Sequence, residues 1–527
     1  MKKLLLIILF STSILFAQTE QRGIELPDFV ITGRQSVEVQ IAQKNKPELV
    51  STLSEDFFTP VFSPEELPVL FSSFPQPAYP NISASGEYFS GSLNIGLGRF
   101  SFPVGKLYLN KSFNHYLVSA GIWGSNIKPY IDNAGYNNSG VKLENTFFIS
   151  TKSDFIPGTK FKLAGEYSRD SYKFYGSTSP NIERKNERGL IEFSAVNTFN
   201  RWVNFQLDLN ANFLNMDDNI LKEKNLNLRS LLEIKLGKMI AGGELNYRKQ
   251  LLDGNFSGID NYDYYSIDGY AKIYPMNNLV VTGGVNLSGH EGNMFFSPFG
   301  EIQYNIFNGL MLKAEFKPHT EFYSISDMLN KNIYFSNLFT DNVFSEVKND
   351  ISALLRYEYN KIFSIDLWSR YSKTDDYLYF DDIFRNGLFL SRTANVKSIA
   401  GGINFLLFPG YFGYLFTELK LQNVTNDLDK YIPYNPLYNL RFSYGYNFPF
   451  DLGFKLSYKY VSGIYADIGN NIELPDYHNL SLHLEYKLLE SLSVTGDFHN
   501  ILNRSNFVLY QYEERPLDLI FGIQYRW

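Results

Sequence analysis

The last twelve residues of the chain alternate between apolar side chains and side chains that are mostly polar or small. In residues 516–527 the odd positions from 517 onward carry Leu517, Leu519, Phe521, Ile523, Tyr525 and Trp527, and the even ones include Asp518, Gly522, Gln524 and Arg526. A period of two places the two sets on opposite faces of an extended strand. About ten such residues, tilted by roughly 45°, span the hydrocarbon core of a bilayer. We therefore predict a closing strand of a transmembrane β-barrel, with Leu519, Phe521, Ile523, Tyr525 and Trp527 facing lipid.

The same alternation recurs along the chain from about residue 82. It is clearest in residues 203–213, 438–446, 452–460 and 480–488. A soluble β-sandwich or propeller also alternates, but it rarely sustains so apolar a face over so many strands. The pattern therefore predicts an all-β fold, a transmembrane antiparallel β-barrel over residues 82–527.

Long polar links between the expected strands alternate with short ones. Residues 504–514, 462–476 and 423–435 form long links, whereas residues 489–491, 447–451 and 408–413 form short ones. Outer-membrane barrels have short periplasmic turns and long external loops. This alternation predicts that the N- and C-terminal ends of the barrel are both periplasmic. Both ends can lie on one side only if the number of strands is even. With roughly 20 residues for each strand and its link, we expect about 22 strands.

The first 81 residues differ from the rest. Lys2 and Lys3 precede an apolar run over residues 4–16, and Ala17 follows. This is the pattern of a secretory signal peptide, residues 1–17, which predicts export from the cytoplasm. Together with the predicted barrel it indicates an outer membrane of the Gram-negative type as the destination. Residues 18–81 are rich in proline, which cannot sit inside a sheet ladder. We expect them to form an extended arm, lying either in the periplasm or within the lumen.

Composition narrows the possible functions. Aromatic residues make up 17% of the 527 residues, and mean hydropathy is −0.20, as expected for a barrel that hides apolar residues at alternate positions. The absence of cysteine excludes disulfides, thiolate metal sites and a cysteine-linked lipid anchor. A net charge of −7 argues against nucleic acid as a partner. We expect no cofactor and no metal.

Two groups of residues could carry chemistry. On the last strands, Ser493, Thr495, Asp497 and His499 face inward beside Ser481, His483 and Glu485. They could form an acid–base cluster, but every polar lumen wall contains such residues, so we expect no enzyme. Residues 374–382 mix carboxylates with aromatics in an expected external loop, which could bind Ca²⁺ or a sugar or could simply be solvated. A third stretch, residues 322–344, is too apolar for free exposure and should fold over the barrel mouth.

The chain resembles the TonB-dependent outer-membrane receptors over residues 82–527. Gly496-Asp497-Phe498-His499-Asn500-Ile501-Leu502-Asn503-Arg504 resembles the next-to-last strand of that family, and residues 519–527 resemble its closing strand. The run Asp28, Phe29, Val30, Ile31, Thr32 and Gly33 is similar to a TonB box. The resemblance implies insertion by the barrel-assembly machinery, contact with outer-membrane lipid, and binding of an unidentified solute. It also implies a partnership with TonB or another periplasmic protein.

The sequence has no counterpart of one feature of TonB-dependent receptors, their globular plug. Residues 34–81 are too few and too proline-rich to form the separate globular plug of these receptors. Three functions therefore stay open: a receptor that binds or transports a solute, a plug-less structural or assembly barrel that recruits a periplasmic partner, and a passive porin-like channel.

Overall fold

The computed structural model describes residues 90–217, 221–254, 261–290, 292–336, 344–360, 362–408 and 413–527. These residues belong to one compact unit, Val61–Trp527. The predicted signal peptide, the proline-rich arm and the TonB-box-like residues Asp28, Phe29, Val30, Ile31 and Thr32 lie outside the described residues. No helix among the described residues combines the length and the apolar character that crossing a membrane requires.

The described chain is almost entirely β-strand. The first half contains β1 (Gly91–Gly98), β2 (Ser101–Phe113), β3 (Tyr116–Ile127), β4 (Tyr136–Phe148), β5 (Lys160–Lys173), β6 (Glu183–Asn197), β7 (Val203–Met216), β8 (Leu221–Leu236), β9 (Met239–Asp253), β10 (Tyr262–Met276), β11 (Leu279–His290) and β12 (Asn293–Phe307). The second half contains β13 (Leu310–Phe316), β14 (His319–Phe322), the helix α2 (Ile325–Lys331), β15 (Phe344–Tyr359), β16 (Phe363–Asp381), β17 (Leu390–Leu407), β18 (Tyr414–Asn426), β19 (Tyr438–Asn447), β20 (Leu452–Ser462), β21 (Tyr477–Leu489), β22 (Leu492–His499), β23 (Phe507–Leu509), β24 (Tyr512–Glu513) and β25 (Asp518–Arg526).

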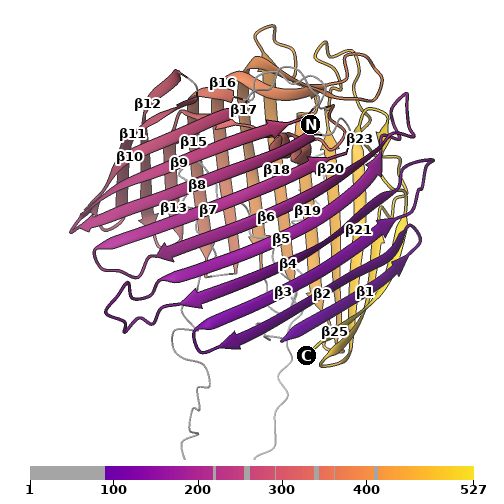
Figure 1. Cartoon of the computed structure of the whole chain (residues 1–527), viewed down its shortest axis with the longest axis horizontal. Helices are drawn as coiled ribbons and strands as arrows, with labels where there is room; N and C mark the ends of the chain where they lie inside the picture. Colours follow the sequence, from indigo (N-terminus) through magenta and orange to yellow (C-terminus); the bar gives the residue numbers. More distant parts are fainter. Residues whose placement is uncertain are drawn as a thin grey trace, which may run out of the picture. The chain divides into compact units, whose positions relative to one another are not determined.

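All of these strands except the hairpin β23–β24 form one antiparallel sheet that closes on itself. Strand β25 pairs with β22 on one side and with β1 on the other (Figure 1). Strands β13 and β14 both pair with β15, one after the other, so the 23 named strands of the sheet occupy 22 positions around the barrel. The prediction of a 22-stranded antiparallel barrel is confirmed.

The closing seam shows why the last residues alternate as they do. Tyr525, Ile523 and Phe521 lie opposite Leu93, Ile95 and Leu97 of β1, which gives a continuous apolar face across the seam. Phe521 is 58% exposed and Ile523 is 56% exposed, as expected for side chains that face away from the barrel interior. Beyond β25, the amide and carbonyl of Trp527 each bond to Gly91, at 3.1 Å. A Cβ at position 91 would lie 2.3 Å from the Trp527 ring, so any larger residue there would displace the terminal indole.

Most of the long links lie at one end of the barrel and most of the short turns lie at the other, although the long link over residues 149–159 lies at the short-turn end. One end carries two-residue turns such as Asn308-Gly309, where Gly309 has a φ of +92°, the left-handed backbone that favours glycine. It also holds Asn360, Glu490, the start of β1 and the end of β25. The other end carries Asn426 and Asn470, next to and within the links over residues 427–437 and 463–476.

The prediction of an external loop over residues 374–382 is wrong. Strand β16 continues to Asp381, and the link to β17 begins only at Asp382. The carboxylates of this stretch misled the prediction, because a strand that extends beyond the apolar band need not alternate apolar and polar residues. A β-bulge between Thr374 and Tyr377 breaks the period further.

Candidate functional site

Four links at the long-link end of the barrel pack together inside its mouth. They are the links after β5 (residues 174–182), after β14 (described over residues 323–336), after β16 (residues 382–389) and after β22 (residues 500–517). We call this assembly the mouth cap. It shares one buried apolar cluster with inward-facing side chains of the wall, among them Leu214, Met216, Leu221, Tyr264, Phe344 and Phe380. The expectation that the apolar stretch over residues 322–344 folds over the mouth is therefore confirmed for residues 323–336, and residues 337–343 lie outside the described residues.

Helix α2 contributes three fully buried side chains to this cluster. Ser324 and Asp327 form a capping box: the Ser324 hydroxyl accepts from the Asp327 amide at 3.1 Å, and the Asp327 carboxylate accepts from the Ser324 amide at 3.0 Å. The box starts the helix immediately after β14. Ile325, Met328 and Leu329 then fall on one face and are fully buried, at 0% exposed.

A buried carboxylate on the wall fixes the start of this helix. Glu223 of β8 is 1% exposed and accepts from the amides of Ile325, at 2.7 Å, and Ser326, at 3.0 Å. It also accepts from the Ser326 hydroxyl and from Gln250 Nε2. The first amides of a helix lack partners within the helix and carry a partial positive charge. Glu223 therefore satisfies them where water is excluded.

Arginines on β6 and β9 hold the cap from the side. The Arg184 guanidinium is 1% exposed, donates to the carbonyl of Ile333 at 3.0 Å, and lies 4.7 Å from the Phe174 ring centre. The Tyr172 hydroxyl donates to the same carbonyl at 2.6 Å. Arg248 donates to the Phe322 carbonyl at 3.0 Å and to Asp327 at 3.1 Å. These contacts tie the cap to the wall at Ile333 and at Asp327.

The links of the cap are also joined to each other. Tyr512 of β24 stacks on Tyr334, with ring centres 3.8 Å apart, and donates to the Gly387 carbonyl at 2.7 Å. The Ser336 amide donates to the Phe389 carbonyl at 2.6 Å, which makes a short β-bridge between the links after β14 and β16. Burial raises the pKa of Tyr334 and Tyr512, so both hydroxyls stay neutral at physiological pH.

The link after β16 has its own internal anchor. The Asp382 carboxylate accepts from the amides of Asn386, at 2.9 Å, and Gly387, at 2.7 Å. Burial raises the pKa of Asp382, and these amide bonds act in the opposite direction by favouring the ionised form. In this turn the Gly387 carbonyl accepts the hydrogen bond from the Tyr512 hydroxyl.

Elsewhere the lumen wall carries charges of both signs, arranged in cross-strand ion pairs. They include Lys162 with Glu144 (3.6 Å) and Glu192 (3.4 Å), Arg229 with Glu244 (2.8 Å), Lys313 with Glu301 (2.9 Å), Arg356 with Asp366 (2.7 Å), Arg370 with Asp350 (2.7 Å), Arg441 with Glu418 (3.5 Å), and Arg526 with Glu485 (3.3 Å). Ion-selective pores present rings of one sign. This wall instead pairs charges of opposite sign.

The candidate acid–base cluster is only partly assembled. His483 Nδ1 lies 2.6 Å from Asp497 Oδ1 on the neighbouring strand. Glu485 pairs with Arg526, and the Ser481 hydroxyl donates to Asn479 at 2.8 Å. Among the hydrogen bonds of the described residues, none joins a serine or threonine hydroxyl to His483. The arrangement is a polar ladder along the lumen wall without a paired nucleophile.

The carboxylates once expected in a loop have protein partners. Asp375 pairs with Lys348, Asp381 is 4% exposed, and Asp382 holds its own turn. Across the ranges that the structure describes, no group of three metal-ligating side chains occurs. Sequence reasoning did not identify Glu223, Arg184 or Tyr512 as anchors, because their roles depend on which residues the barrel places opposite them.

Comparisons with known proteins establish the fold. No family model and no curated protein sequence matches the chain. Among solved structures it is similar to the ferric-catecholate import receptor Fiu of E. coli K12, at a TM-score of 0.64 and 10% identity, over 84% of this chain and 82% of that one. It is also similar to the FrpB iron transporter of Neisseria meningitidis, at a TM-score of 0.65 and 11% identity, over 84% and 82% of the two chains.

A third similar structure is the ferric enterobactin receptor PfeA of Pseudomonas aeruginosa, a mutant in complex with enterobactin. Its TM-score is 0.63 at 11% identity, over 83% of this chain and 81% of that one. At such low identity the likeness speaks to architecture, and it agrees with the closed sheet described above. The chain has the 22-stranded barrel fold of these outer-membrane receptors, as its resemblance to TonB-dependent receptors predicted.

Proposed function

We propose that this protein is an outer-membrane barrel that binds a solute at its outer mouth and transports it across the membrane. The mouth cap carries this proposal. A passive 16- to 18-stranded porin keeps an aqueous channel, whereas 22-stranded outer-membrane transporters have a filled lumen. Here several links fold into the mouth and anchor on buried Glu223 and Arg184, which a permanently open pore does not require.

The similar structures support the same reading. They are an import receptor for ferric catecholate, an iron transporter and a ferric enterobactin receptor. The paired lumen charges agree with transport, because a wall without excess charge of one sign neither traps nor repels a charged solute. We assign no enzymatic activity, since the polar ladder around His483 lacks a paired nucleophile among the described residues.

The proposed orientation places the long links and the mouth cap outside the cell, with both chain termini in the periplasm. Epitope tags inserted next to Asn426 or Asn470 should then be labelled by antibody on intact cells. Tags next to Asn360 or Glu490 should be labelled only after the outer membrane is permeabilised. The two pairs of tag positions lie at opposite ends of the barrel. The opposite labelling pattern would therefore show that the proposed orientation is inverted.

We further propose that the arm couples the barrel to TonB. Residues 29–31 are β-branched or aromatic, and Pro27 and Gly33 limit the run on either side. Such a segment is suited to adding a strand to the sheet edge of a partner, and proline removes a donor from that pairing. Val30→Pro should abolish capture of the TonB periplasmic domain by the purified protein and leave the amount of folded barrel unchanged.

The control is Thr59→Pro, which places the same residue beside the existing Pro60. If Val30→Pro and wild type capture TonB equally, the TonB-box assignment is wrong. The second candidate function, a structural barrel that recruits a periplasmic partner, would then take its place. The shortness of residues 34–81, which cannot form a separate plug domain, is the observation that favours this alternative.

A further inference from the structure

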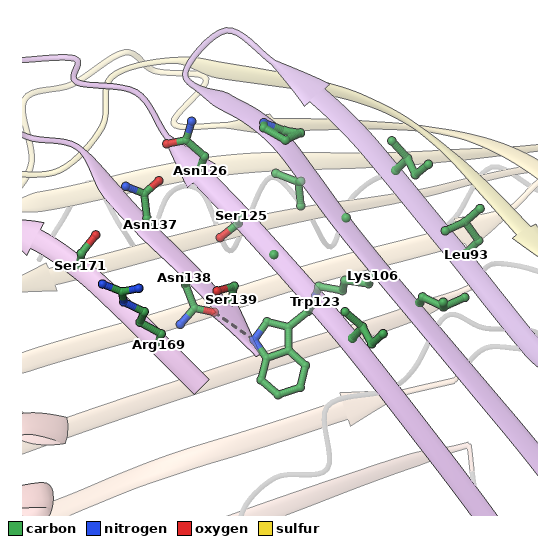
Figure 2. A pocket seen from close by; sticks show the side chains of 17 residues that line it. Leu93, Lys106, Trp123, Ser125, Asn126, Asn137, Asn138, Ser139, Arg169 and Ser171 are labelled. Atoms are coloured by element: carbon green, nitrogen blue, oxygen red, sulfur yellow. Dashed lines mark hydrogen bonds between the residues drawn. The ribbon is translucent and has the colours of Figure 1, made fainter. Parts of the chain in front are cut away.

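A groove crosses the outer surface of the barrel wall over β1 to β5 (Figure 2). It has a volume of about 690 Å³. Its floor follows one row of cross-strand neighbours: Ile95, Gly105, Gly124, Ser139 and Arg169. These residues share the outward face with Ile122, which is 56% exposed, and with Leu143, which is 60% exposed. The groove therefore opens toward the membrane and not into the lumen.

The groove exists because two glycines lie directly opposite each other. Gly105 pairs with Gly124, and neither has a positive φ. A Cβ added at Gly105 would find its nearest atom at 4.0 Å, and one at Gly124 would find it at 3.9 Å. Neither backbone conformation nor packing requires glycine at these positions. The effect of both residues is to leave an outward-facing hollow.

The two sides of the groove differ in polarity. Toward the short-turn end it is bordered by the row Leu93, Leu107 and Ile122. Toward the long-link end it is bordered by Asn126, Asn137 and Ser171, which are also cross-strand neighbours. An occupant must therefore be apolar along one side and polar along the other.

Arg169 supplies a positive charge at the end of the groove. Its direct neighbour on β6 is Glu187, yet no salt bridge joins the two in the described structure. Glu187 instead accepts from Asn215 Nδ2 at 3.3 Å. The exposed Arg169 side chain lines the groove beside Ser171 and Ser139 (Figure 2). Its five donors form a planar fork that matches a phosphate group.

We propose that this groove binds one membrane lipid with a phosphate headgroup. An acyl chain would lie along Leu93, Leu107 and Ile122 over the two glycines. The phosphate would accept from Arg169, with hydroxyl and amide donors from Ser139, Ser171 and Asn137. The groove crosses the strands, which tilt by roughly 35–45° in such barrels, so a chain seated in it can still descend into the bilayer. The site lies nearer the long-link end and so, in the orientation proposed above, in the outer leaflet.

The test uses the full-length protein in detergent, with lipid binding measured by native mass spectrometry. The probes are dioleoyl phosphatidic acid and dioleoylglycerol, which carry the same acyl chains with and without a phosphate. Arg169→Gln should weaken binding of phosphatidic acid by about tenfold, the scale expected for one charge-assisted bond, and leave dioleoylglycerol unaffected. Gly124→Leu fills the hollow and should weaken binding of both lipids.

Matched controls are available on the same surface. Lys111→Gln removes an exposed outward charge from the opposite end of β2, and Gly165→Leu adds an outward side chain where no atom lies within 4 Å. Neither should change lipid binding. Equal binding of phosphatidic acid by wild type and Arg169→Gln would overturn the proposal, as would equal losses in Arg169→Gln and Lys111→Gln. If Gly124→Leu does not fold, Gly105→Leu fills the same hollow from the facing strand. The assay involves no transport, so its result is independent of the proposed uptake function.

Discussion

Replacing both Phe521 and Tyr525 with aspartate is expected to eliminate the folded barrel. Both side chains lie on the outward face of β25, opposite Leu97 and Leu93 of β1, and Phe521 is 58% exposed. A charge facing lipid costs roughly 2–4 kcal/mol for a basic residue at the midplane, and somewhat less for an acidic one. This free-energy cost destabilises β25, which pairs with both β1 and β22. Without β25 in place the sheet cannot close. The loss of the heat-modifiable band on a gel would report this outcome.

The control places one aspartate on the other face of the same strand. Gln524 faces the lumen, where Arg526 donates to its side-chain carbonyl at 2.5 Å. Gln524→Asp keeps an acceptor for Arg526 and should fold in normal amounts. Normal amounts of folded double Asp variant would contradict the assignment of the odd residues to the lipid-facing side.

The strands were predictable because the membrane imposes a simple rule on them. In a barrel wall one face meets lipid and the other meets the lumen, so a period of two in the sequence maps directly onto the structure. The stretch from Leu519 to Trp527 shows this rule, and its partner β1 repeats it with Leu93, Ile95 and Leu97. The strand count followed from allowing roughly 20 residues for each strand and its link.

The rule fails where a strand leaves the membrane. The outer part of β16 carries Asp375, Asp376 and Asp381, and its period shifts at a bulge after Thr374. Lipid no longer selects apolar residues there, and pairing with β15 as far as Asp375 and with β17 as far as Asp381 keeps the chain extended. A sequence pattern cannot distinguish such a segment from a polar loop.

The anchors of the mouth cap were not predictable for a different reason. Glu223 and Ile325 are 102 positions apart, Tyr512 and Gly387 are 125 apart, and Arg184 and Ile333 are 149 apart. Each contact depends on the register of many intervening strands. The groove on the outer wall depends on register in the same way, because Gly105 and Gly124 form a hollow only where they face each other.

Introducing an acidic residue into the buried face of α2 is expected to detach the mouth cap and leave the barrel intact. Met328 is 0% exposed and packs within the shared apolar cluster. Truncating a buried methionine alone costs about 2–5 kcal/mol, and Met328→Asp would in addition bury an unpaired charge. The wall keeps its own cross-strand hydrogen bonds, so the protein should still give the heat-modifiable band. Residues 323–336 should become sensitive to added protease, and ion conductance in a planar bilayer should rise.

Asn330→Asp is the matched control, because Asn330 lies two residues away on the exposed face of the same short helix. It adds the same charge in water, where burial imposes no cost, and should leave protease resistance and conductance at wild-type levels. Equal protease sensitivity in the two variants would show that burial of α2 does not hold the cap. Cleavage of residues 323–336 in Met328→Asp without a rise in conductance would show that the mouth cap is not what closes the lumen, and it would remove the main support for gated transport through the mouth.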